Sequence, residues 1–237
     1  MKIIAIGDIH GKDIWKKIVV NKGPEDIVVF IGDYLDSWDV PPAKQVSNFH
    51  EILEYKRQHM YDCILLIGNH DFHYMARSGD YERYSGWNAK TRDLLGSVLE
   101  DAVRDNLLQI AYEKDRNLFT HAGVTKKWLK RAGLEDSTNL TLAADINSLF
   151  KEDVHHFRFA VGADDHGDDP RNSPIWVRPP SLQENQVEGL NQIVGHTMIP
   201  QIYITPKFDH VSFIDVLDKV NEYLEITNGG VKIMRFI

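Results

Sequence analysis

The sequence predicts an α/β fold: a layered β-sandwich of two mixed sheets flanked by helices, in one domain that spans residues 1–237. In the first half of the chain, short β-branched apolar runs alternate with segments of helical length. The second half is rich in short strands separated by turn residues. Hydrophobic residues make up 43% of the chain and charged residues 26%, which is enough to bury a core without disulfides.

Three apolar runs near the start are expected to be buried parallel strands. They cover residues 3–6, 27–31 and 64–67, and each ends at a glycine followed by polar residues. The segments near residues 12–21 and 43–59 have helical length and spacing. A βαβαβ order of this kind predicts neighbouring parallel strands joined by right-handed crossovers.

The middle of the chain is expected to be largely helical, with a pair of strands in it. Residues 72–106 have a mostly helical pattern, and residues 107–112 and 117–120 have strand patterns. Further helical patterns follow near residues 125–132 and 140–150.

The last part of the chain begins with a predicted loop and continues as strands. Residues 162–173 are rich in acidic residues and histidine and are expected to form an exposed loop. Asn228-Gly229-Gly230 is a strong hairpin signal. The expected strands lie near residues 191–195, 202–205, 211–216, 222–227 and 231–236.

Polar residues follow five of the predicted strands. These residues are Asp8 and His10, Asp33 and Asp36, Asn69 and His70, His121, and His196. Because loops at the carboxyl ends of parallel strands gather at one edge of a sheet, these side chains are expected to lie together. A mixed set of carboxylate, imidazole and amide ligands can hold two metal ions. A carboxylate that bridges two ions keeps them roughly 3.5–4 Å apart and lets them activate a shared water.

Five motifs carry a resemblance to a known family. They are Gly7-Asp8-Ile9-His10-Gly11, Gly32-Asp33-Tyr34-Leu35-Asp36, Gly68-Asn69-His70-Asp71, His121-Ala122-Gly123 and Gly195-His196-Thr197. Their order and spacing resemble the calcineurin-like metallophosphoesterases, most closely the phosphoprotein-phosphatase branch with its phage and bacterial members. One such motif is weak evidence, but five in order are specific. The resemblance implies a four-layer αββα sandwich.

The resemblance also implies a dinuclear metal site. Its ligands would be Asp8 and His10 for the first metal, Asp33 as the bridge, and Asn69, His121 and His196 for the second metal. Manganese is the expected metal, and the same ligands accept iron, zinc or nickel.

The implied reaction is in-line attack of metal-bound hydroxide on a phosphate. His70 would be the general acid that protonates the leaving alkoxide, and Asp36 would orient its imidazole. Arg178 matches a Trp-x-Arg pattern of the phage-type phosphatases. Together with Asn69, it is expected to contact the substrate phosphate.

The sequence departs from the family pattern after Asp36. The phosphatase branch has Arg-Gly there, and this chain has Ser37-Trp38, so one phosphate-binding arginine is missing. Arg77 or Arg83 is a candidate replacement because both follow the Asn-His motif. Trp38 is expected either to stack on a substrate ring or to pack against the following prolines.

The leading functional hypothesis is hydrolysis of a phosphate monoester, in a phosphoprotein or a small metabolite. Hydrolysis of a nucleotide anhydride, such as a diadenosine polyphosphate, is the alternative, and phosphodiester cleavage ranks third. A non-catalytic metal-binding protein ranks lowest because Asp36 and His70 are both present.

The composition limits which partners and which cellular location are expected. The net charge of −8 and the sequence pI of about 5.7 argue against nucleic acid as a partner. The single cysteine, Cys63, lies in an apolar run and is expected to be a buried thiol in a reducing, cytoplasmic environment. No segment has the length of a membrane span. Oligomeric state is left open.

Overall fold

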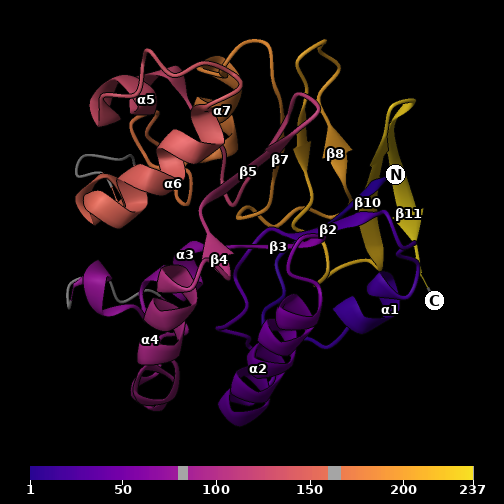
Figure 1. Ribbon diagram of the computed structural model, residues 1–237, viewed down its shortest axis with the longest axis vertical. Helices are drawn as coiled ribbons and strands as arrows, with labels where there is room; N and C mark the ends of the chain where they lie inside the picture. Colours follow the sequence, from indigo (N-terminus) through magenta and orange to yellow (C-terminus); the bar gives the residue numbers. More distant parts are fainter. Residues whose placement is uncertain (80–84, 160–166, 237) are drawn as a thin grey trace.

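The computed structural model describes residues 1–79, 85–159 and 167–236 (Figure 1). Two β-sheets, one of six strands and one of five, pack together and are flanked by helices. Both sheets contain parallel and antiparallel pairs, so the predicted fold class is confirmed.

The six-stranded sheet has four parallel strands in its centre and on one side. Its order is β11-β10-β1-β2-β3-β4, and only the pairs that involve β10 are antiparallel. The strands are β1 (Ile3–Ile6), β2 (Ile27–Phe30), β3 (Cys63–Leu66), β4 (Leu108–Gln109), β10 (Glu222–Thr227) and β11 (Gly230–Arg235).

The five-stranded sheet has three parallel strands between two antiparallel edges. Its order is β5-β6-β7-β9-β8, with β6, β7 and β9 parallel. The strands are β5 (Ala111–Lys114), β6 (Asn117–Thr120), β7 (Asn191–Val194), β8 (Tyr203–Ile204) and β9 (Val211–Phe213).

Alternating side chains of the central strands bury both faces of the six-stranded sheet. In β1, Ile4 and Ile6 contribute to the core beneath the helices, whereas Ile3 and Ala5 contribute to the core between the sheets. This two-sided burial explains why parallel strands appear in the sequence as continuous apolar runs. Cys63 of β3 is fully buried, as predicted, and burial raises the pKa of its thiol to about 12.

Two groups of helices flank the sandwich (Figure 1). The first group packs on the outer face of the six-stranded sheet and comprises α1 (Trp15–Val19), α2 (Pro42–Gln58) and α4 (Ala89–Arg104). The second group comprises α5 (Lys126–Ala132), α6 (Leu142–Glu152) and α7 (Pro179–Glu184). No helix in the described ranges is long and apolar enough to cross a membrane.

The strand predicted at residues 107–112 is two strands in two different sheets. The chain leaves the six-stranded sheet after β4 and enters the five-stranded sheet at β5, with Ile110 between them. The side-chain oxygen of Asn147, on α6, accepts hydrogen bonds from the backbone N–H groups of Ile110 and Ala111 (2.9 and 3.0 Å). An apolar run gives no sign of this change of sheet, because both halves are buried strands.

Two other expectations need correction. The helix expected near residues 12–21 is shorter, since α1 covers only Trp15–Val19. By contrast, the described part of residues 72–106 is mostly helical, as predicted: it holds the end of α3 (Asn69–Phe72), a 3-10 turn (Ala76–Ser78) and α4.

The predicted exposed loop at residues 162–173 is also partly wrong. Within its described part, residues 167–173, the side chains of Asp169, Asn172 and Ser173 are buried. Ser173 Oγ donates a hydrogen bond to the carbonyl oxygen of Phe157 (3.0 Å), which ties the segment to the body of the protein.

Candidate metal centre

The carboxyl ends of strands from both sheets bring the predicted polar residues together. Asp8, His10 and Asp33 each offer one ligand atom, and these atoms lie within 4.8 Å of one another. His10 Nδ1 lies 2.8 Å from the carbonyl oxygen of Leu35, so this nitrogen donates and Nε2 carries the lone pair.

Two other predicted histidines, His121 and His196, both lie next to the side chain of Asn69. Its side-chain oxygen lies 2.9 Å from His121 Nε2 and 2.8 Å from His196 Nδ1. Asp33 Oδ2 lies 3.3 Å from His121 Nε2 on the same side. The four atoms belong to residues that follow β2, β3, β6 and β7, two strands from each sheet.

The backbone contacts of His121 and His196 leave the inward-facing ring nitrogens available to bind a cation. His121 Nδ1 lies 3.0 Å from the carbonyl oxygen of Ile31, and His196 Nε2 lies 3.2 Å from that of Trp176. When an imidazole is neutral and its proton lies on the nitrogen that faces a carbonyl oxygen, the nitrogen that faces Asn69 carries a lone pair. Burial, followed by the charge of Arg178, lowers the pKa of His196 well below its ordinary value and keeps the ring neutral. Converging lone pairs about 3 Å apart fit a metal whose ligand bonds are about 2.0–2.2 Å long.

The carboxylates of the centre also need a cation. Asp8 and Asp33 are both buried. Burial, and then the charges of Asp215 and Asp33, raises the pKa of Asp8 well above its ordinary value. In Asp33, burial acts in the same direction, but the imidazoles of His121 and His70 outweigh it and hold the pKa well below the ordinary value. A metal ion would balance this concentrated negative charge.

His70 and Asp36 form a hydrogen-bonded pair beside the ligand cluster. His70 Nδ1 lies 2.9 Å from Asp36 Oδ2, and the backbone N–H of His70 donates to Asp33 Oδ1 (2.8 Å). Burial alone would lower the pKa of His70, but the charge of Asp33 and the hydrogen bond to Asp36 outweigh it. The pKa is raised to about 9. The pair can therefore hold a proton on the imidazole.

Two residues that the sequence analysis left without a site role hold Asp36 in place. Tyr74 Oη donates to Asp36 Oδ1 (2.5 Å), and His73 Nε2 lies 2.6 Å from Asp36 Oδ2. Burial would raise the pKa of Asp36, but the hydrogen bonds from His70, His73 and Tyr74 keep it below the ordinary value. His73 is buried, which fits a structural role beside Asp36.

Asp71 organises the backbone of the site. Its carboxylate accepts hydrogen bonds from the backbone N–H groups of Asp33, Tyr34 and Gly68 (2.8, 2.8 and 2.9 Å). A Cβ atom on Gly68 would overlap Asp33 Oδ1, so only glycine leaves room for the predicted bridging carboxylate. The Gly-Asn-His-Asp motif contained this signal, because it placed Asp71 as a third polar residue in the same turn.

Several site residues have strained backbones. The φ angles of His10, Asp33, Asp36 and His196 are +42°, +49°, +64° and +66°. A non-glycine residue in this region costs about 1–3 kcal/mol, and the surrounding structure must maintain it. The strain fits turns that aim side chains at a shared point rather than along their own strands.

A cavity of about 260 Å³ opens over this cluster and includes Arg178 and Trp38 among its lining residues. The Arg178 guanidinium lies 3.4 Å from the carbonyl oxygen of His196 and 3.3 Å from Thr197 Oγ1. The structure thus brings Arg178 to the cavity. The side chain of Trp38 is 81% exposed, so of the two alternatives for this residue, packing against the following prolines is not observed.

The structure does not bring Arg77 to this cavity. Its guanidinium pairs with Glu100 (2.6 Å) and lies over the ring of Phe150, 5.4 Å from the ring centre. Arg77 therefore does not replace the missing phosphate-binding arginine. The other candidate, Arg83, lies outside the described residues.

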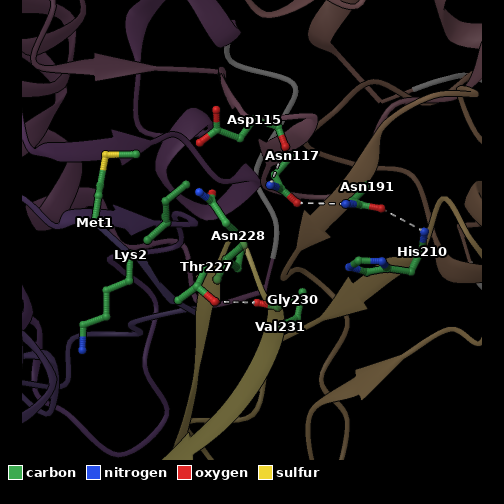
Figure 2. A pocket seen from close by; sticks show the side chains of 12 residues that line it. Met1, Lys2, Asp115, Asn117, Asn191, His210, Thr227, Asn228, Gly230 and Val231 are labelled. Atoms are coloured by element: carbon green, nitrogen blue, oxygen red, sulfur yellow. Dashed lines mark hydrogen bonds between the residues drawn. The ribbon is translucent and has the colours of Figure 1, made fainter.

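Another cavity, of about 400 Å³, lies at the amino ends of β1, β6 and β7 (Figure 2). Two of its amide side chains, Asn117 and Asn191, are hydrogen-bonded to each other. Asn191 Nδ2 donates to Asn117 Oδ1 (3.0 Å), and the backbone N–H of His210 donates to Asn191 Oδ1 (3.3 Å). None of the predicted site residues lines this cavity. They lie at the carboxyl ends of the strands, so the candidate active site is there and not at the amino ends.

Comparison with protein families gives a match over most of the chain. Residues 1–200 match the calcineurin-like phosphoesterase family. Among curated relatives, the symmetrical bis(5'-nucleosyl)-tetraphosphatase of Pseudomonas fluorescens is 28% identical over 161 residues, which cover 64% of this chain and 44% of the relative. The enzyme of the same name from Azotobacter vinelandii is 32% identical over 114 residues, 44% of this chain and 36% of the relative. The matched part thus spans less than half of each relative.

Solved structures share the fold at low sequence identity. A cold-active protein-tyrosine phosphatase of a Shewanella species has a TM-score of 0.65 at 19% identity, with 99% of this chain and 77% of that chain covered. A Saccharomyces cerevisiae serine/threonine phosphatase has a TM-score of 0.58 at 13% identity, with 100% and 80% covered. A protein described as a putative diadenosine tetraphosphatase has a TM-score of 0.51 at 13% identity, with 100% and 94% covered.

Proposed function

The chain belongs to the calcineurin-like phosphoesterase family and is a hydrolytic enzyme, and we propose that it is a metal-dependent phosphatase acting on a phosphate monoester. The substrate would be a phosphoprotein or a small phosphorylated metabolite. The reaction would take place in the cavity over Asn69, His70 and Arg178.

One observation carries the proposal: a ligand cluster and a proton-donating pair share one cavity. The six proposed ligands are Asp8, His10, Asp33, Asn69, His121 and His196. Two metal ions held there would polarise the phosphoryl oxygens and lower the pKa of a water molecule.

The remaining roles belong to side chains of the protein. His70 holds a proton that its Nε2 atom can pass to the leaving oxygen, because Nδ1 is engaged by Asp36. Asp36 fixes the orientation of the ring and favours its protonated form. The Arg178 guanidinium stands at the wall of the cavity and would bind phosphoryl oxygens.

The His70–Asp36 pair favours an ester over an anhydride. An alkoxide is a poor leaving group and must be protonated as the P–O bond breaks, whereas a phosphate leaving group is stable as an anion. A side chain poised to give up a proton is therefore of most use for an ester.

The test compares His70→Asn with the native protein on phenyl phosphate and p-nitrophenyl phosphate. Loss of the general acid should lower kcat by about 10²- to 10⁴-fold for phenyl phosphate. The loss should be much smaller for p-nitrophenyl phosphate, whose leaving group is more acidic. Metal content should stay near two ions per chain.

The control is His50→Asn, which changes an exposed histidine of α2. Equal losses on the two esters would remove His70 as the general acid. Loss of the metals in His70→Asn would instead identify His70 as a ligand.

A second candidate function is hydrolysis of a nucleotide anhydride such as a dinucleoside polyphosphate. The observation that favours it is Trp38, whose exposed indole lines the cavity where the phosphatase branch has Arg-Gly. The names of the curated relatives agree with this alternative. A dinucleoside tetraphosphate in the same assay, compared with phenyl phosphate by kcat/KM, separates the two candidates.

A further inference from the structure

The carboxyl end of β9 carries a polar residue that corresponds in position to His196. β7 and β9 are parallel neighbours, and Val194 pairs with Phe213 at their ends. His196 comes two residues after β7, and Asp215 comes two residues after β9. The same topology that places His196 in the cluster therefore places Asp215 beside it.

Backbone contacts hold Asp215 close to Asp8. A Cβ atom on Gly7 would overlap the carbonyl oxygen of Ile214, so only glycine allows the end of β1 to approach this segment. The backbone N–H of Ile214 donates to the carbonyl oxygen of Val194 (2.8 Å). The carbonyl oxygen of Asp215 accepts from the N–H of Ile199 (3.0 Å), which fixes the other side of the turn.

The Asp215 carboxylate is buried without a partner among the described residues. The residue is 4% exposed and lines the same cavity as His10 and Asp33. Within the described ranges, no hydrogen-bond donor and no basic side chain contacts its carboxylate oxygens. Lys12, the lysine whose charge it feels, pairs with Asp218 instead. A buried carboxylate in this state is costly unless a cation balances it.

The close approach at Gly7 and the cavity wall that Asp215 shares with His10 and Asp33 place this carboxylate on the Asp8 side of the cluster. After burial, Asp215 is the largest cause of the raised pKa of Asp8, ahead of Asp33. For Asp215 itself, burial raises the pKa most, and the imidazole of His10 opposes it. These effects agree with a position of Asp215 beside Asp8 and His10.

We infer that Asp215 is a further oxygen ligand of the first metal, together with Asp8, His10 and Asp33. This inference rests on the proposed metal-dependent function. The first metal would then have three carboxylates and one imidazole around it, whereas the second has one carboxylate, one amide and two imidazoles. The extra carboxylate gives the first site more hard oxygen ligands than the second site has. The first site should therefore favour manganese or iron over metals that prefer softer ligands.

The test is calorimetric titration of metal-stripped, full-length protein with Mn²⁺, comparing the native chain with Asp215→Asn and Asp215→Ala. Both variants should bind Mn²⁺ at one of the two sites about 10- to 100-fold more weakly than the native chain does. Binding at the other site should not change. Asp136→Asn, which alters an exposed carboxylate, is the matched control.

Thermal unfolding of the metal-free proteins separates a ligand from a merely structural residue. If Asp215 is a ligand, Asp215→Asn removes an unbalanced buried charge, so the metal-free variant should unfold at the same temperature as the native chain or higher. Lower stability of the metal-free variant, or failure to fold, would contradict the inference. Native affinity at both sites in Asp215→Asn would also overturn it.

The native chain tests the proposed function separately. If it bound no Mn²⁺ and hydrolysed none of the phosphate substrates, the proposed function itself would fail. If the native chain binds two Mn²⁺ ions and hydrolyses phenyl phosphate while Asp215→Asn keeps full affinity, only the inference about Asp215 fails.

Discussion

Each histidine of the candidate metal centre uses one ring nitrogen on the backbone and turns the other inward. His10, His121 and His196 lie against the carbonyl oxygens of Leu35, Ile31 and Trp176, respectively. Two of these carbonyls belong to the loops that follow β2, so the same loop that carries Asp33 also sets the tautomers of its neighbours. The metal-facing atoms are therefore set before any metal binds.

Trp38 is the residue for which the structure decided between two stated alternatives. Its indole lines the cavity and is 81% exposed, so it is free to stack on a substrate ring. Stacking of a base on an aromatic side chain is worth about 1–3 kcal/mol. Trp38→Ala should therefore raise KM for a dinucleoside polyphosphate by about 5- to 150-fold, and Trp38→Tyr should retain most of the affinity.

Steady-state kinetics checks this prediction with β-glycerophosphate as the substrate that lacks a ring, for which KM should not change. Tyr61→Ala removes an equally exposed aromatic side chain outside the cavity and is the control. An unchanged KM for the dinucleoside polyphosphate in Trp38→Ala would show that Trp38 is not part of the substrate site.

At the scale of elements, short strands and tight turns carry the site. The parallel strands that lead into it have at most four residues, and the polar residues follow within six residues of the strand ends. The positive φ angles of His10, Asp33, Asp36 and His196 lie in these turns. The regular strands supply the scaffold, and the irregular turns aim the side chains.

The passage from β4 to β5 joins the two sheets and depends on one side chain of α6. Asn147 accepts the N–H groups of Ile110 and Ala111 and donates Nδ2–H to the carbonyl oxygen of Ala111 (2.8 Å). Asn147→Ala would leave the N–H groups of Ile110 and Ala111 without this acceptor, at a cost of about 1–3 kcal/mol in the free energy of unfolding.

Urea unfolding measures this cost. Asn147→Asp keeps an acceptor for both N–H groups and should lose less stability than Asn147→Ala. Ser148→Ala changes the exposed neighbour on the same helix and should have little effect. A midpoint for Asn147→Ala equal to that of the native protein would show that the sheet-to-sheet passage does not need this side chain.

At the scale of the whole molecule, folding concentrates negative charge between the sheets. Asp8, Asp33 and Asp215 are buried close together, and the lysine nearest to Asp215 is engaged elsewhere. Binding of a cation to the folded state alone stabilises it by about 2.7 kcal/mol at one hundred times its dissociation constant. In a domain of this size, that amounts to roughly 5–10 °C in Tm.

Removal of metal with a chelator should therefore lower the Tm by several degrees, and added Mn²⁺ should restore it. Differential scanning calorimetry with parallel metal analysis checks this expectation. Equal concentrations of a monovalent salt serve as the control for ionic strength. If the Tm stayed constant while the bound metal was lost, the buried carboxylates would not depend on a cation.

Much of the fold and of the ligand set could be predicted because both follow from local patterns. Parallel strands buried on two faces appear as apolar runs, and their carboxyl ends meet at one edge. The structure confirms the two mixed sheets, and it brings together the residues that the five motifs named. Those residues follow directly from strand ends, so sequence order was enough to locate them.

The sequence by itself thus determined the fold class, the family and the residues that gather at the strand ends. Only the tertiary structure decided that Arg77 lies elsewhere, that Trp38 is exposed at the cavity, and that His73, Tyr74 and Asp71 brace the site. It also placed Asp215 in the wall of the same cavity. The physical reason is that these properties depend on contacts between segments far apart in the chain, which neither hydrophobic period nor motif spacing encodes.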